Sequence, residues 1–522
     1  MKKRNVFLAC IICASVSASY AQNHVTRSDD GLLDAMQTEM DYEKKEIESQ
    51  LTGNSFFLEF TASKSRDFSV LAHGMDTKCD EGIPAYACKA TITFTGDRVV
   101  RENAAQVPQS NVFRDDDSWK SLQEGLRMST KKSIASVIDN TRDYRLNTLG
   151  ARFVSLPPIM QIEESAFSTP VHVDMMKSLC GKVRANIAKC SALYDDTLCI
   201  ALHRADLYRV TSEGQKTRSA ECYYMVRFVA YGKNSEGRDS RFVFSKEYGQ
   251  DQLQRLSSEV EKDLLGFVSA ATAACQAKEV EKEISYEGPV LFEGDAAWYV
   301  VFKDHEWYNQ LYTNAASGRY PMGMDVCHPL VSISQKNDMK SAHRHVVDAD
   351  GTVMRNVQLV SDGKLVNKVG GRILYDKEVG STGNYIFSSL IMNPSTRYAV
   401  LHAVSAKTES EGRIRKDFIK EAKAKSLPYA YIIRNSYGLS ELVEVNVKTG
   451  EEMVLDADVR QQDVQMTEDD EFSKEECFFN TLYGGNLATY VFPRMVLMKK
   501  VKVGIKKPVA IQNLNDAFMF TR

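Results

Sequence analysis

The sequence lacks the features that define several common enzyme classes. It contains no GxxxxGK[ST], GxGxxG or GxSxG, so the phosphate-binding loop, the dinucleotide fingerprint and the serine-hydrolase elbow are not expected. It has only 12 prolines, and its 66 basic residues are balanced by 69 acidic ones, for a net charge of −3. That balance argues against nucleic acid as a partner, because neutralising a phosphate backbone needs a basic surplus. With 43% hydrophobic residues, the 522-residue chain can still bury the cores of several domains.

Long apolar runs are also missing, since no segment has 18 consecutive apolar residues, and no membrane span is predicted. The first 21 residues instead predict a signal peptide. Lys2–Arg4 form a positively charged start, Val6–Val16 form an apolar stretch, and Ser19–Ala21 fits the small-x-small cleavage rule. A membrane anchor is the alternative, but the apolar stretch is well short of the ~20 residues that a span needs. We therefore expect export to the periplasm or the extracellular space.

Cysteine usage does not indicate a fold built on disulfides. Nine cysteines remain after the signal peptide, and this odd number cannot pair completely within one chain. Cys79 and Cys88 flank a turn-rich segment and are the predicted local disulfide. The mature chain has no CxxC motif, which is the usual spacing of small zinc and redox sites.

The N-terminal part of the mature chain alternates between helical and β patterns. Apolar residues at helical spacing predict a helix over 31–51. Strands are predicted over 56–61, 69–73 and 91–95, where β-prone residues cluster. A second helix is predicted over 115–139, because three aspartates at its start suit a helix N-terminus. Helix, meander and helix in this order indicate an α+β fold rather than a doubly wound parallel sheet.

The middle part predicts an antiparallel meander between two helices, over 170–190 and 253–275. Ser212-Glu213-Gly214 and Ser235-Glu236-Gly237 are predicted turns, since glycine permits the positive φ that tight turns need. These turns separate strands predicted over 207–211, 221–231 and 241–244. The charged stretch 278–283 is the predicted domain boundary.

The C-terminal part is predicted to consist mostly of strands. Turns at 348–351 and 361–363 separate two of them. An amphipathic helix is predicted over 411–425, with Ile414, Phe418 and Ala422 facing inward. The acidic segment 468–471 is predicted to be a solvated loop rather than a metal site.

These patterns predict an α+β fold with antiparallel and mixed sheets. The predicted organisation is a signal peptide over 1–21, an N-terminal α+β region over 22–150, a middle region over 151–283 and a strand-rich C-terminal domain over 284–522.

Several sequence phrases occur in an order that is typical of one family. The most specific is YEGPVLFEGDAA, which spans Tyr286–Ala297. The others are the Ser212-Glu213-Gly214 turn with Arg218, the pair Asp348–Gly351 and Leu359–Leu365, and the strand Lys89–Asp97. Together they cover nearly the whole mature chain. The ordered set resembles the TldD/PmbA family of metallopeptidases, in particular its exported members from Bacteroidetes-type bacteria.

The resemblance implies an N-terminal α+β region, a middle region and a strand-rich C-terminal domain. It also implies homodimers or heterodimers that enclose a cavity open to peptides. Active members of the family carry HExxxH shortly after the GPVL phrase and a third zinc ligand, a cysteine, near the C-terminus. Two histidines about one helical turn apart face one metal, and the glutamate activates the attacking water.

This chain departs from that zinc motif. The ungapped position of the first His-Glu holds Phe302-Lys303, and three residues further His305-Glu306 is followed by Gln310 instead of a second histidine. The last 45 residues contain no cysteine. Glutamine is a poor zinc ligand, and the family includes a branch without HExxxH. The zinc motif is therefore predicted to be degenerate.

Two groups of histidines are nevertheless candidate metal ligands. His305 could bind zinc with Glu306 as the base, and His343 and His345 would share one face of a strand, where two imidazoles bind Zn or Cu if a third ligand is available. Surface histidines without a metal are the expectation we favour at both places. Cys327 and His328 are neighbours on a strand and would point to opposite faces, so they do not form a dyad.

The sequence leaves the enzymatic status open and supports three functional hypotheses. The first is a non-catalytic pseudo-peptidase that binds peptide or unfolded protein, as a homodimer or beside a TldD/PmbA paralogue, without a cofactor. The second is an active zinc metallopeptidase that degrades unstructured peptides with rearranged ligands. The third is a structural protein that binds the cell envelope. Peptide capture by strand addition is the expected mode in the first two cases.

Overall fold

The structure is a computed structural model with an α+β fold. It describes residues 31–50, 55–74, 76–95, 99–101, 119–142, 152–234, 237–249, 256–302, 320–337, 339, 347–348, 351–374, 380–386, 395–396, 399–483 and 486–506. Within these ranges, none of the helices combines the length and apolarity that crossing a membrane requires.

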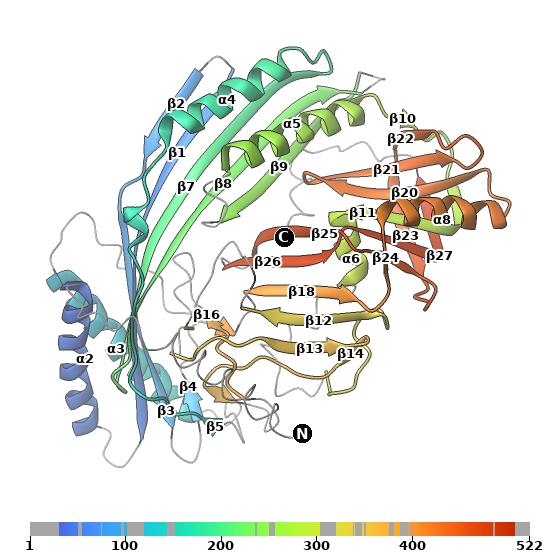
Figure 1. Cartoon of the computed structure of the whole chain (residues 1–522). Helices are drawn as coiled ribbons and strands as arrows, with labels where there is room; N and C mark the ends of the chain where they lie inside the picture. Colours follow the sequence, from blue (N-terminus) through green and yellow to red (C-terminus); the bar gives the residue numbers. More distant parts are fainter. Residues whose placement is uncertain are drawn as a thin grey trace, which may run out of the picture.

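A long curved sheet forms one side of the molecule (Figure 1). It has eight strands in the order β4-β3-β1-β7-β8-β6, with β2 paired to β1 and β9 paired to β8. Its strands are β1 Phe56–His73, β2 Asp76–Glu81, β3 Ala85–Thr95, β4 Val99–Arg101, β6 Met160–Ile162, β7 Leu193–Thr211, β8 Lys216–Lys233 and β9 Asp239–Gly249.

The antiparallel meander predicted for the middle region is confirmed, but its strands are longer than the apolar runs indicated. β1 is one continuous strand, so the prediction of two strands over 56–61 and 69–73 was wrong. It pairs with β7 from Glu59 opposite Thr211 to His73 opposite Thr197. This pairing places strands from both sides of residue 150 in one sheet. The domain limits themselves remain predictions.

Four helices cover the apolar face of this sheet: α2 Gly31–Gln50, α3 Trp119–Arg142, α4 Val173–Ile187 and α5 Leu256–Cys275. α2 and α3 pack on Leu58 and Phe60 of β1, and α4 and α5 pack on Val70 and the neighbouring strands. Because side chains alternate along a strand, the opposite face carries polar residues such as Thr61 and Ser63, which are also buried. Figure 1 shows α4 and α5 at one end of the sheet and α2 and α3 at the other.

The C-terminal part contains two further sheets. The nine-stranded sheet has the order β10-β22-β21-β20-β11-β27-β24-β19, with β23 on β27, and the six-stranded sheet has the order β14-β13-β12-β18-β26-β25. The first comprises β10 Lys278–Glu279, β11 Ile284–Gly294, β19 Thr408–Glu409, β20 Tyr429–Ser436, β21 Leu439–Asn446, β22 Glu452–Asp456, β23 Asp458–Val464, β24 Glu471–Ser473 and β27 Met495–Lys506. The second comprises β12 Val331–Lys336, β13 Val357–Ser361, β14 Lys364–Leu365, β18 Val400–Ser405, β25 Glu476–Tyr483 and β26 Asn486–Pro493.

One apolar core joins these two sheets around the short helix α6 Asp295–Val301. On the other face of the nine-stranded sheet lies α8 Glu411–Ala424. Its inward residues are Ile414, Phe418 and Ala422, as predicted. Two short pairs complete the fold, β5 Arg152–Phe153 with β15 Ile373–Leu374 and β16 Tyr385–Ile386 with β17 Ser395–Thr396.

The predicted Cys79–Cys88 disulfide is wrong, and both thiols are free. Cys79 lies opposite Val70, and Cys88 lies opposite Ala62, so their partners are eight residues apart along β1. At about 3.3 Å per residue this separation is roughly 26 Å. A disulfide needs Cα atoms within about 7 Å.

Candidate functional site

The residues with predicted metal or catalytic roles, His305, Glu306, His343 and His345, all lie outside the described residues. The structure therefore does not test those predictions. Within the described ranges, no group of three or more His, Cys, Asp or Glu side chains is placed to hold a metal ion. The candidate site is therefore built from the family-like phrases and the polar clusters that the structure describes.

The YEGPVLFEGDAA phrase forms β11 and the turn into α6. At both of its glycines the neighbouring atoms leave no room for a side chain. A Cβ at Gly288 would lie 2.5 Å from the Tyr286 hydroxyl, and a Cβ at Gly294 would lie 2.4 Å from the Asn435 carbonyl oxygen. Gly294 also has a φ of +63°, which side chains rarely adopt. The phrase thus fixes the parallel contact between β11 and β20 and starts α6 at Asp295.

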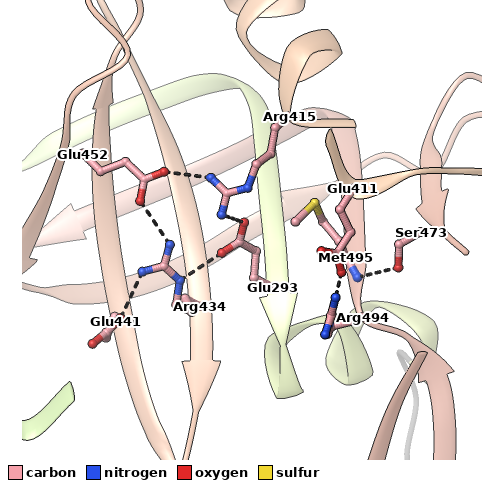
Figure 2. Close-up of polar contacts among 9 residues, drawn as sticks. All are labelled: Glu293, Glu411, Arg415, Arg434, Glu441, Glu452, Ser473, Arg494 and Met495. Carbon is pink, nitrogen blue, oxygen red and sulfur yellow. Dashed lines mark hydrogen bonds and ion pairs between the residues drawn. The ribbon is translucent and has the colours of Figure 1, made fainter. Parts of the chain in front are cut away.

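Glu293, at the end of β11, is the centre of a charge network that Figure 2 shows. It accepts hydrogen bonds from Arg415 of α8 and, at 2.9 Å, from Arg434 of β20. The same two guanidinium groups bind Glu452, and Arg434 also reaches Glu441. Burial raises the pKa of Glu452, but the two arginines outweigh it and the pKa lies below its ordinary value. Every charge is paired, so the network joins strands and helix. Burial raises the pKa of Glu441 above its ordinary value although Arg434 opposes the shift.

His328 and Asp470 form a pair that is closed to solvent. Both side chains are 0% exposed, and His328 Nε2 lies 3.1 Å from Asp470 Oδ2. The backbone N–H of Leu330 donates to His328 Nδ1 at 3.0 Å. Nδ1 must therefore be the unprotonated nitrogen, and Nε2 carries the hydrogen that Asp470 accepts. The ring has no lone pair left for a metal.

Asp470 corrects the prediction that 468–471 is a solvated loop. Its carboxylate also accepts the N–H groups of Thr467 at 2.6 Å and Lys499 at 2.9 Å. Glu468 and Asp469 are exposed, whereas Asp470 and Glu471 are buried. The charges of these four residues did not indicate which of them are buried, because the acidic run extends across the start of β24.

Cys327 and His328 lie outside any strand, so the strand that the sequence analysis assumed for them was wrong. They still do not form a dyad, because both His328 ring nitrogens are engaged by Leu330 and Asp470. The Cys327 thiol contacts the backbone oxygens of His328 and Val331 at 3.8 Å. Burial raises the pKa of this thiol to about 12, so it stays protonated at neutral pH. It is neither a nucleophile nor a ready metal ligand.

His203 lies on the polar face of the long sheet and is 3% exposed. Its Nδ1 is 2.6 Å from Asp67 Oδ1 on β1, and its Nε2 is 3.8 Å from Glu221 Oε2 on β8. Burial alone lowers the pKa of His203, but hydrogen bonding and the charges of the two carboxylates outweigh it and raise it to about 9. The imidazole is therefore positively charged at neutral pH and joins three strands electrostatically. The sequence analysis did not single out this residue.

The Ser212-Glu213-Gly214 turn contacts both strand β1 and Arg372 of the C-terminal part of the chain. Ser212 Oγ accepts the Leu58 N–H at 3.0 Å, which fixes the turn on β1. Glu213 binds the guanidinium of Arg372, which comes from the C-terminal part and also donates to Val154 O at 2.9 Å. The guanidinium carbon lies 4.3 Å from the Phe57 ring centre and 4.7 Å from that of Phe153. The role of this turn is to hold Arg372 in a cation–π sandwich.

Three of the described histidines, His203, His328 and His402, are not placed to serve as zinc ligands. A histidine binds zinc through a neutral imidazole with a free lone pair. His203 is protonated, both ring nitrogens of His328 are engaged, and His402 Nε2 lies 2.7 Å from Glu476 Oε1.

The fold is nevertheless shared with known structures. No protein-family profile matches the chain, and no curated protein matches its sequence. Three solved structures are similar over nearly all of both chains. A candidate modulator of a DNA gyrase from Thermotoga maritima is 12% identical, covers 90% of this chain and 99% of its own, and has a TM-score of 0.58.

The other two structures come from different organisms. TldE from Thermococcus kodakarensis is 12% identical, with coverage of 90% and 99% and a TM-score of 0.55. A candidate modulator of DNA gyrase from Bacteroides thetaiotaomicron is 11% identical, with coverage of 91% and 99% and a TM-score of 0.56. The fold of this chain is thus that of TldE-type proteins, and the resemblance to the TldD/PmbA family is confirmed at the level of the fold.

Proposed function

We propose that this protein is an exported, TldD/PmbA-like binding subunit that holds an extended peptide or partner chain without cleaving it. The observation that carries the proposal is the TldE-type fold over 90% of the chain, combined with Gln310 in the place of the second zinc histidine. Loss of the metal ligands removes hydrolysis but not the sheets that a peptide can extend. Assembly with a second copy or a paralogue belongs to the same proposal.

We place peptide capture at the outer edge of β2. Within the described strands β2 pairs only with β1, and all six of its residues are exposed. An extended peptide adds to such an edge through main-chain hydrogen bonds, with little demand on its sequence. β2 carries Asp76, Asp80, Glu81 and Lys78. Arg66 pairs with Glu81 at 3.2 Å, which leaves two negative charges to one positive on the rest of the strand. This edge therefore favours peptides with basic side chains.

Blocking this edge is expected to weaken peptide binding strongly. Cys79, in the middle of β2, is an exposed free thiol. A bulky maleimide attached there covers the strand edge, and we expect at least a tenfold loss of affinity for an unstructured basic peptide. Fluorescence anisotropy measures the affinity, and mass spectrometry of the peptide after incubation shows whether it stays intact.

The matched control is Cys79→Ser treated with the same reagent, which keeps any modification of the remaining cysteines. This variant is expected to bind like the untreated protein. Full binding by the maleimide-modified wild type would remove β2 as the site. Cleavage of the peptide, suppressed by a chelator, would instead overturn the non-catalytic function.

A further inference from the structure

Two cysteines lie beside the same short segment, where the chain leaves α4 next to α5. Cys190 follows the last turn of α4, and its Sγ lies 3.0 Å from Thr272 Oγ1 on α5. Cys275 follows Thr272 by three residues, and residues at this spacing share one face of a helix. Cys275 Sγ lies 3.8 Å from the backbone oxygen of Ala192. Both sulfur atoms therefore border the short connection between α4 and β7.

The surroundings of the two sulfur atoms are closely packed. A Cβ on Gly232 of β8 would lie 2.5 Å from Cys275 Sγ and 2.8 Å from the Ala192 oxygen. Only glycine lets β8 approach this closely. Cys275 is 2% exposed, whereas Cys190 is half-buried. A reagent from solution can reach Cys190 first.

The two thiols also differ in reactivity. Burial raises the pKa of Cys190, but the hydrogen bond it shares with the Thr272 side chain and those from the N–H groups of Ala192 and Leu193 outweigh it. The pKa of Cys190 therefore lies below its ordinary value. For Cys275, burial and then the charge of Cys190 raise the pKa to about 11. The thiolate is the attacking species in disulfide exchange, and it forms more readily on Cys190.

We infer that Cys190 and Cys275 are a thiol–disulfide pair, in which Cys190 attacks and Cys275 resolves. The co-reactant is a low-molecular-weight disulfide. The Cys190 thiolate bonds to one of its sulfur atoms, and the other half leaves as a thiolate that takes up a proton. Cys275, giving up its proton, then attacks Cys190 Sγ and releases the second half as a thiol. The two cysteines lose two electrons and two protons, which the small disulfide gains as two thiols.

The resulting link fastens the outer helical layer of the long sheet. Cys190 and Cys275 are 85 positions apart in the sequence, so the link closes a long loop of the unfolded chain. Closure of a loop of this size is expected to raise Tm by about 4 °C for a chain of this length.

The test uses the full mature protein, incubated with either oxidised glutathione or dithiothreitol. Non-reducing peptide mapping by mass spectrometry is expected to find Cys190 joined to Cys275 only in the oxidised sample, together with the higher Tm. In Cys275→Ser the resolving thiol is missing, so Cys190 is expected to retain glutathione. Cys190→Ser is expected to show neither product.

The matched control is Cys88→Ser, which changes a cysteine on β3, far from this contact, and is expected to form the same link. The wild-type map decides the question even if a variant folds poorly. A glutathione adduct that persists on wild-type Cys190, or a link of either residue to a different cysteine, would overturn the inference. These outcomes do not depend on peptide binding or metal content.

Discussion

Replacing Arg372 by alanine is expected to lower the free energy of unfolding by about 3–5 kcal/mol. The side chain is 1% exposed, lies between Phe57 and Phe153, and pairs with Glu213. Its loss leaves a cavity between two aromatic rings and a carboxylate without its cation. Urea unfolding, followed by circular dichroism, measures the change.

Two further variants distinguish the contribution of the stacked guanidinium group from that of its charge and from a surface substitution. Arg372→Lys keeps the charge but not the planar group that stacks on the rings, and an intermediate loss is expected. Arg355→Ala removes an exposed arginine from the same part of the chain and is expected to change stability by less than about 0.5 kcal/mol. A loss for Arg372→Ala no larger than that of Arg355→Ala would contradict the proposed role of the sandwich.

Replacing Asp470 by asparagine is expected to cost about 3 kcal/mol, although the shape hardly changes. The two carboxylate oxygens accept three hydrogen bonds, from Thr467, Lys499 and His328. An amide offers one oxygen and points its NH₂ group at a donor. Even with the amide oxygen turned toward His328 and Thr467, the NH₂ group opposes the buried Lys499 N–H. Thermal unfolding of the two proteins side by side measures the difference.

The control for this substitution is Glu468→Gln, which removes the same charge two residues earlier on an exposed side chain. It is expected to leave Tm within about 1 °C of the wild type. Equal effects of the two substitutions would show that net charge, and not the hydrogen bonds of the buried carboxylate, sets the stability here.

The local elements of the fold were largely predictable from the sequence. The helices α2, α4, α5 and α8 follow from apolar residues at helical spacing, and Ile414, Phe418 and Ala422 face inward as predicted. Gly214 of the predicted Ser212-Glu213-Gly214 turn has the positive φ that this turn was expected to need. Periodicity and turn chemistry act over a few residues, which is why they can be read directly.

Long-range partners were not predictable in this way. The polar segment between Thr61 and Ser69 has little β propensity, yet it lies within β1, because pairing with β7 on one side and with β3 and β2 on the other satisfies its backbone. Arg372 and Asp470 gave no local signal, since their partners Glu213 and His328 are 159 and 142 residues away. Such pairs are set by the fold, so only the structure identified them.

In the candidate site, too, local features were predictable from the sequence and long-range partners were not. The family-like phrases identified the region around Glu293, but no local pattern indicated that Arg415 and Arg434 would neutralise its charge. The histidines proposed as metal ligands lie outside the described residues. Whether the protein binds zinc and cleaves peptides is therefore a question for biochemical measurement.

The most direct test of the proposed function is the metal content of the mature protein, purified without a histidine tag and measured by elemental analysis. A non-catalytic subunit is expected to carry far less than one zinc per chain and to leave bound peptide intact. Zinc close to one per chain, together with chelator-sensitive cleavage that His305→Ala abolishes, would contradict the proposal and establish a metallopeptidase.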